Sequence, residues 1–244
     1  MILSTTEAQL SEALSRLASW NHASTLLARA VYDWHGEWWL RDTYIGLLLA
    51  NTRVYRLLNH AFQLRELTIG ALAARNALEL KTWIRYATRG EVNARRLYDD
   101  QMVDARDIMT RVKRLVTLIP ADQRPEELDS VLENSQKLIL EKGPEFNVRE
   151  EDRYLRTHSL AEQAGCGAEF KDMFPILSKL VHPSAMAMFL NHSGETGDEQ
   201  LLNVCNVGVS YFAQNIDDLN AHLKSASFPH IVQAEDMSLE IKGP

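Results

Sequence analysis

The sequence predicts an all-α protein, an irregular bundle of about seven helices, and three observations support that fold class. Apolar residues recur every three or four positions over most of the 244 residues, the spacing that gives a helix one buried face. No stretch combines strand-length alternation with hairpin dipeptides such as Asn-Gly or Asp-Gly. No internal repeat of fixed period is present, so the pattern of a stacked-repeat protein is missing.

The N-terminal part of the chain favours long helices. Residues Thr5–Trp20 place three leucines on one face behind a Thr-rich start that suits a helix N-terminus. The same pattern continues from His22 to His60, where Gly36 indicates a break between two helices. Residues Phe62–Thr88 contain no proline and are rich in strong helix formers, which predicts a central helix.

The C-terminal part alternates helical patterns with breaks at glycine and proline. Interleaved charges along the first of these patterns are typical of a long helix with one solvated side. Residues Glu145–Arg153 are polar and aperiodic, which indicates a loop. The expected helices are Glu91–Ile119, Glu126–Glu141, Ser159–Ala164, Ala168–Val181, Ser184–Leu190 and Glu199–Lys224.

The expected organisation is one helical domain and a tail. The domain spans residues 1–224, with Trp-rich N-terminal helices over 1–61 and a helical core over 62–224. Residues 225–244 form the C-terminal tail. With 45% hydrophobic and 24% charged residues, the chain has the composition of a globular protein that folds without disulfides or metals.

Charge and targeting signals narrow the function classes. A net charge of −7 disfavours a protein whose whole surface neutralises phosphates, and it leaves a local basic cleft open. The two cysteines, Cys166 and Cys205, lack the paired spacing of zinc or redox motifs and are expected to be reduced structural thiols. The N-terminus lacks a secretory pattern, and the longest apolar stretch, Tyr44–Ala50, is too short for a bilayer. We expect a cytoplasmic protein that does not enter a membrane.

Several common catalytic motifs are absent from the sequence. There is no His-Glu-x-x-His, no Asp-rich cation loop, no phosphate-binding glycine loop and no Gly-x-Ser-x-Gly elbow. We therefore expect no metal and no cofactor.

Two short segments carry residues suited to chemistry. In the predicted helix Phe62–Thr88, Arg75 falls on the stripe expected to be buried, and Glu79 lies one turn later as its natural partner. Such a pair either orients a site or holds helices together. In the second segment, His182 precedes a proline break and follows Ser178 by one turn. An imidazole at such a break can serve in acid or base catalysis, or can pack at a helix junction.

These two segments together resemble a known group of proteins. Arg75-Asn76-Ala77-Leu78-Glu79 and Leu177-Ser178-x-x-Val181-His182-Pro183-Ser184 are similar to a bacterial helical family of unknown function. That family in turn resembles abortive-infection proteins of the AbiV kind and the wider HEPN superfamily. The resemblance spans roughly residues 62–223 and rests on these two motifs. It implies a HEPN-like core over 62–224, a role in phage defence and a homodimer.

Active HEPN proteins cut RNA without a metal, through an Arg and a His separated by four to six residues. The segment that ends at His182 occupies the place of that motif, and no Arg precedes His182 at that spacing. Two other pairs have the spacing, Arg153 with His158 and Arg53 with His60. We prefer Arg153 and His158, because a polar segment leading into a short helix can face solvent.

Two further features could contact RNA or a protein. Trp34, Trp38 and Trp39 offer large rings for a core, a dimer interface or base stacking. The segment from Arg85 to Arg114 is the most basic part of the chain, although interspersed aspartates dilute it.

Two functions follow as expectations. The first is a HEPN-like effector of a bacterial or phage conflict system that binds RNA and acts as a metal-independent ribonuclease. Its catalytic candidates are His182, Ser178, Arg75, Glu79, Arg153 and His158. The alternative is a non-catalytic helical module that binds a protein partner or forms a dimer.

Overall fold

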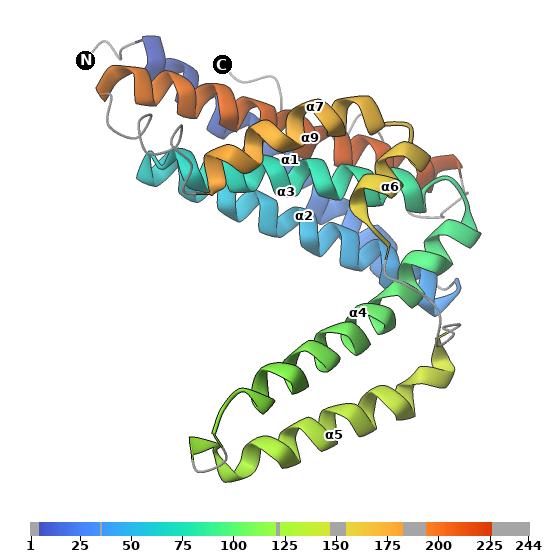
Figure 1. Ribbon diagram of the computed structural model, residues 1–244. Coiled ribbons are helices and arrows are strands. Elements are labelled where there is room, and N and C mark those ends of the chain that lie inside the picture. Colours follow the sequence, from blue (N-terminus) through green and yellow to red (C-terminus); the bar gives the residue numbers. More distant parts are fainter. Residues whose placement is uncertain (1–4, 35, 121–122, 147–154, 183–193, 226–244) are drawn as a thin grey trace.

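The computed structural model describes residues 5–34, 36–120, 123–146, 155–182 and 194–225 (Figure 1). These ranges contain eight α-helices, one 3₁₀ turn and no strand, which confirms the all-α class. The elements are α1 (Thr5–Tyr32), α2 (Trp38–Leu64), α3 (Leu67–Ala87), α4 (Glu91–Thr117), α5 (Glu126–Lys142), η2 (Gly143–Glu145), α6 (Thr157–Gln163), α7 (Gly167–Val181) and α9 (Gly194–Ser225).

Helix α3 lies at the centre of the bundle, as the sequence predicts (Figure 1). It packs against α9, α2 and α7, and more lightly against α6 and α4. Thirteen of its 21 residues are buried, and five of those thirteen are alanines. A helix that is buried on most of its circumference needs small side chains on several faces, because its neighbours must approach from more than one direction.

Glycine sets the closest approach of α3 to its neighbours. A β-carbon on Gly208 of α9 would lie 2.8 Å from Leu58 Cδ2 and 3.2 Å from the Cα of Ala74. A β-carbon on Gly70 of α3 would lie 2.9 Å from the Cys205 sulfur. Burial raises the pKa of that thiol to about 12, so Cys205 is a protonated core residue, as the sequence predicts.

Two fully buried asparagines fix how three helices meet. The side-chain amide of Asn215 on α9 donates to the side-chain oxygen of Asn51 on α2 at 3.3 Å. It also donates to the backbone carbonyl of Ala77 on α3 at 3.2 Å. Since a sliding helix would leave these buried polar groups without partners, the contacts favour one register.

The predicted helix Phe62–Thr88 is wrong at its start. Phe62 belongs to α2, and the chain turns at Arg65, whose φ of 52° lies in the left-handed region. The Arg65 N–H donates to the carbonyl of Ala61, which closes α2 with a left-handed cap. Arginine seldom adopts this conformation, so the sequence carries no signal for the break.

Other helix boundaries agree only in part with the sequence prediction. The expected helix Thr5–Trp20 continues without a break to Tyr32, so α1 is longer than predicted. The break at Gly36 is confirmed, because α2 begins at Trp38. The predicted helix Ser184–Leu190 and most of the loop Glu145–Arg153 lie outside the described residues.

Helices α4 and α5 form an antiparallel hairpin that projects from the bundle (Figure 1). The first turns of α4 pack on α2 and α3, whereas α5 packs on α4 and η2. Within the part of the chain that the structure describes, no helix has a run long and apolar enough to cross a membrane.

We expect Gly208→Ala to lower the free energy of unfolding by about 1–3 kcal/mol, because the new methyl group meets the backbone of α3. The matched control is Gly46→Ala on α2, where a β-carbon has no atom within 4 Å. This change removes a helix-interior glycine and should stabilise the protein by about 0.5–1 kcal/mol. Urea denaturation of both variants measures the difference, and equal effects would contradict the close packing.

Candidate functional site

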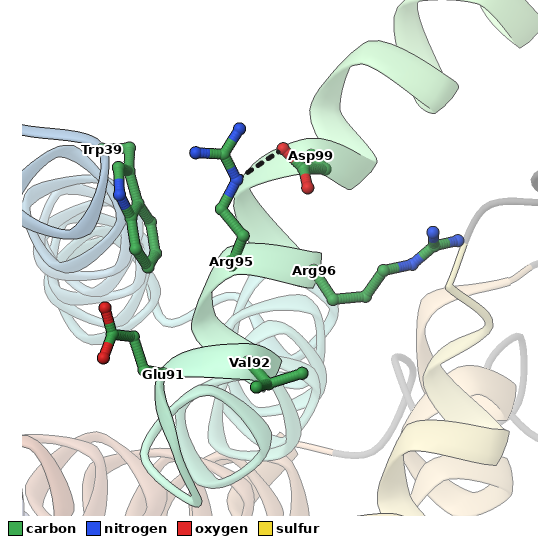
Figure 2. Close-up of a pocket in the computed structure, with 6 residues that line it drawn as sticks. All are labelled: Trp39, Glu91, Val92, Arg95, Arg96 and Asp99. Atoms are coloured by element: carbon green, nitrogen blue, oxygen red, sulfur yellow. Dashed lines mark hydrogen bonds and ion pairs between the residues drawn. The ribbon is translucent and has the colours of Figure 1, made fainter. Parts of the chain in front are cut away.

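A hollow lined by both an aromatic ring and charged side chains lies where α2 begins against the first turns of α4. It is lined by Trp39, Glu91, Val92, Arg95, Arg96 and Asp99, and its volume is about 490 Å³ (Figure 2). We call it the Trp39–Arg95 pocket. Five of the six residues come from α4, where positions 91, 95 and 99 share one helix face. Trp39 supplies the opposite wall from the first turn of α2.

Arg95 is the organising residue of this pocket. Its guanidinium carbon lies 5.2 Å from the ring centre of Trp39 and 5.5 Å from that of Tyr98. Its Nε donates to Asp99 Oδ1 at 3.0 Å, and an Nη donates to the backbone carbonyl of Glu145 at 2.9 Å. Cation–π contacts and two hydrogen bonds therefore hold the planar group in one orientation.

A row of aromatic rings continues from the pocket. The ring of Trp38 meets Tyr98 edge-on at 5.6 Å, and Phe146 stacks on Tyr98 at 5.1 Å. Trp38 keeps 45% of its surface exposed, whereas Trp39 is buried. Burial, and then the nearby charges of Asp42 and Glu145, raise the pKa of Tyr98. The exposed ring of Trp38 is the one that a ligand in solution can reach.

The charges around the pocket are balanced. The lining carries two arginines and two carboxylates, Glu91 and Asp99, and the Asp99 side chain is only 4% exposed. Within the electrostatic influence of Glu91, the hydroxyl of Tyr44 lies 2.6 Å from Nε2 of His222. Burial, and secondarily the charge of Glu91, raise the pKa of Tyr44, and burial lowers the pKa of His222. Both side chains are therefore uncharged at neutral pH, and their hydrogen bond links α2 to α9.

A flat, polar ligand matches this arrangement. Aromatic and guanidinium planes stack on planar rings, arginines pair with phosphates, and carboxylates accept hydrogen bonds from exocyclic amines. Nucleobases joined to phosphates combine these features. No group of three or more His, Cys, Asp or Glu side chains suited to a metal is found among the described residues.

The predicted partnership of Arg75 with Glu79 is confirmed. Arg75 Nε lies 3.1 Å from Glu79 Oε1, and the guanidinium lies 4.5 Å from the ring centre of Phe174 on α7. The Arg75 side chain is 24% exposed, so the prediction that it lies on a buried stripe holds only in part.

Two phenyl rings separate Arg75 from His158. Phe174 stacks on Phe170 at 4.8 Å, and the exposed His158 ring meets Phe170 edge-on at 6.2 Å. The fold therefore places these two candidates on one side of the α3, α6 and α7 layer, with no direct contact. Arg153, the predicted partner of His158, lies outside the described residues.

His182 lies farther along the same layer. It is exposed and ends α7, and its backbone N–H donates to the carbonyl of Ser178 at 3.0 Å. The guanidinium of Arg75 lies over the ring of Phe174, and Phe174 precedes His182 by eight residues. Eight residues correspond to about 12 Å along a helix axis. The Ser178 hydroxyl oxygen is buried and has no hydrogen-bond partner among the described residues. The structure thus keeps His182 apart from the Arg75–Glu79 pair along α7.

The second Arg and His pair of HEPN spacing lies on α2. Arg53 and His60 are both exposed, and their seven-residue separation places them on one face of that helix.

One buried charge escaped the sequence analysis. Lys81 on α3 is only 3% exposed, and its ammonium lies 2.6 Å from Glu169 of α7 and 4.9 Å from the ring centre of Tyr211 on α9. Burial, followed by the charge of Glu169, raises the pKa of Tyr211. Lys81 and Glu169 are 88 positions apart in the sequence, so no local sequence pattern could reveal this ion pair. Through these two contacts, Lys81 links α3 to both α7 and α9.

The chain matches no protein-family model, no curated protein and no solved structure.

Asp100, next to the pocket residue Asp99 in the sequence, should make the free energy of unfolding depend on pH. Both carboxylate oxygens accept from the backbone N–H of Leu155, at 2.9 and 3.1 Å. Burial nevertheless raises the pKa of this carboxyl from 3.8 to about 6. The folded protein therefore binds more protons than the unfolded chain between these values, and stability falls as pH rises through that window.

We expect Asp100→Asn to stabilise the protein by about 1–2 kcal/mol at pH 8, with the gain disappearing near pH 4. Asparagine keeps an acceptor for the Leu155 N–H and removes the charge that folding disfavours. Urea denaturation at both pH values tests this, with Asp129→Asn on the exposed side of α5 as the control. A variant that is destabilised equally at both pH values would refute the explanation.

Proposed function

We propose that the protein binds single-stranded RNA at the Trp39–Arg95 pocket, as a HEPN-like effector of a bacterial or phage conflict system. The observation that carries the RNA-binding proposal is the guanidinium of Arg95, held against Trp39 and Tyr98 beside an open hollow. The conflict-system role rests on the resemblance of the Arg75–Glu79 and Leu177–Ser184 segments to abortive-infection proteins.

The chemistry favours a single strand over a duplex. Bases must be unstacked from each other before they can lie on Trp38 or enter the pocket beside Trp39. A protein with a net charge of −7 has little general attraction for the dense phosphate charge of a double helix. Stacking should therefore supply most of the affinity, and salt should weaken binding only modestly.

The proposal extends to metal-independent cleavage of the bound strand. Two exposed imidazoles, His158 and His182, are available for proton transfer, and Arg75, two phenyl rings away from His158, supplies positive charge on the same side of the α3, α6 and α7 layer. Under this proposal, RNA is degraded in the presence of a chelator, and His158→Ala or His182→Ala abolishes the degradation. Intact RNA under all conditions would leave a binding protein without nuclease activity.

The alternative is a non-catalytic module in which the same surface binds a protein partner. The exposed ring of Trp38 favours it, since exposed tryptophans are enriched in protein interfaces. The two functions differ in their response to RNA, because a protein-binding surface has no reason to recognise a single strand.

We expect Trp38→Ala to weaken binding of a short single-stranded RNA by about 5- to 100-fold, the range for loss of one stacked base. Fluorescence anisotropy of a labelled oligonucleotide measures the change. The control is Leu49→Ala, which removes another exposed apolar side chain, elsewhere on α2. No RNA binding by the unmodified protein, or equal binding by both variants, would refute the proposed site and favour the protein-binding alternative.

A further inference from the structure

More than half of the large apolar side chains that are exposed in the described residues lie on the α4–α5 hairpin and its turn. Twelve such side chains are exposed in the described part of the chain, between 37% and 82% of their surface. Seven belong to the hairpin and its turn: Val92, which lines the Trp39–Arg95 pocket at the start of α4, and, farther along, Ile108, Leu115, Leu118, Ile119, Val131 and Leu138. This concentration is unusual, because isolated exposed apolar residues are normal on a monomer and a contiguous group marks an interaction surface.

Four of these residues form two stripes. Ile108 and Leu115 are seven residues apart on α4, and Val131 and Leu138 are seven residues apart on α5. Seven residues make about two helical turns, so each pair lies along one side of its helix.

Both stripes lie on the same flank of the hairpin. Val116 of α4 and Leu132 of α5 are buried, at 8% and 9% exposed, although this part of the hairpin projects from the bundle, so we take them as the residues that face the other helix. Lys113 of α4 donates a hydrogen bond to the side-chain oxygen of Gln136 on α5 and supports this register. Leu115 and Val131 immediately precede these two buried residues. Two antiparallel helices are related by a two-fold rotation about an axis perpendicular to both. Because of this symmetry, the residue just before a contact residue points to the same side of the pair on both helices. The hairpin thus presents one apolar flank that spans both helices.

The two arms of the hairpin carry opposite charge. From Asp104 to Thr117, α4 has four basic and two acidic residues. Helix α5 has two basic and five acidic residues. At the edges of the apolar stripes, Arg111 follows Ile108 by three residues and Glu141 follows Leu138 by three. A surface with this pattern is complementary to a second copy of itself when the basic arm faces the acidic arm.

We propose that a second copy of this chain covers the apolar flank, with α4 of one protomer facing α5 of the other. Two hairpins joined in this way form an intermolecular four-helix bundle around a two-fold axis, in which each contact occurs twice. The apolar stripes fill its centre, and Arg111 meets Glu141 of the partner subunit at its edge. This surface is separate from the Trp39–Arg95 pocket, so the inference does not depend on RNA binding.

The first test is the mass of the full chain in solution, measured by light scattering after size exclusion. The unmodified protein should have twice the chain mass of 27.8 kDa, and Leu115→Asp with Leu138→Asp should have the single mass. Because both leucines are exposed, at 62% and 57%, the double variant should keep its helical content and melting temperature. The control, Leu64→Asp, changes a residue that is 62% exposed at the end of α2 and should remain dimeric.

Charge reversal tests the orientation of the two hairpins. Arg111→Glu and Glu141→Lys should each weaken dimerisation alone, because each places like charges at both symmetric contacts. An equimolar mixture of the two variants should recover the dimer, since both contacts then pair opposite charges. A monomeric unmodified protein, or a dimer unaffected by aspartate at positions 115 and 138, would overturn the proposal. A dimer that loses nothing on charge reversal would overturn the pairing of α4 with α5.

Discussion

The close packing of α3 is the constraint on which the rest of the structure depends. Its alanines and Gly70 let α2, α7 and α9 approach from different sides, and Gly208 lets the α9 backbone come near Ala74. Because these residues are small, each helix–helix contact of α3 buries little apolar surface from α3 itself. The polar links of Asn215 and Lys81 to neighbouring helices then decide which register each neighbour takes.

This central packing also positions both candidate sites. Arg75 can pair with Glu79 and cover Phe174 because α7 lies along α3. At the other end of α3, the chain turns through Gly90 and α4 leaves the bundle, which brings Arg95 against Trp39. The Arg75–Glu79 pair lies on α3 itself, and the pocket lies on α2 and α4, which both pack against α3.

Much of the fold could be predicted from the sequence, because helical periodicity is a local signal. The all-α class, the central helix and the pairing of Arg75 with Glu79 all depend on residues within a few turns of each other. The break at Arg65 could not be predicted, since its left-handed backbone is selected by tertiary packing and not by the preference of arginine.

The candidate sites show the same limit. Trp39 belongs to the tryptophan group and Arg95 to the basic segment, but their contact joins α2 to α4 across 56 positions. Lys81 and Glu169 show the same limit. In the sequence each resembles an ordinary charge on a helix surface, but the fold buries Lys81 against Glu169. Long-range contacts of this kind leave no spacing signal in a single sequence.

The most direct test of the RNA-binding account is ultraviolet crosslinking of the protein to a single-stranded RNA, followed by identification of the crosslinked peptides. The account predicts crosslinks at Trp38, Trp39 or Tyr98, because stacked aromatic rings lie in contact with bases. Crosslinks confined to α1 and α9, or to the His182 end of α7, would show that RNA binds elsewhere and would contradict the assignment of the Trp39–Arg95 pocket.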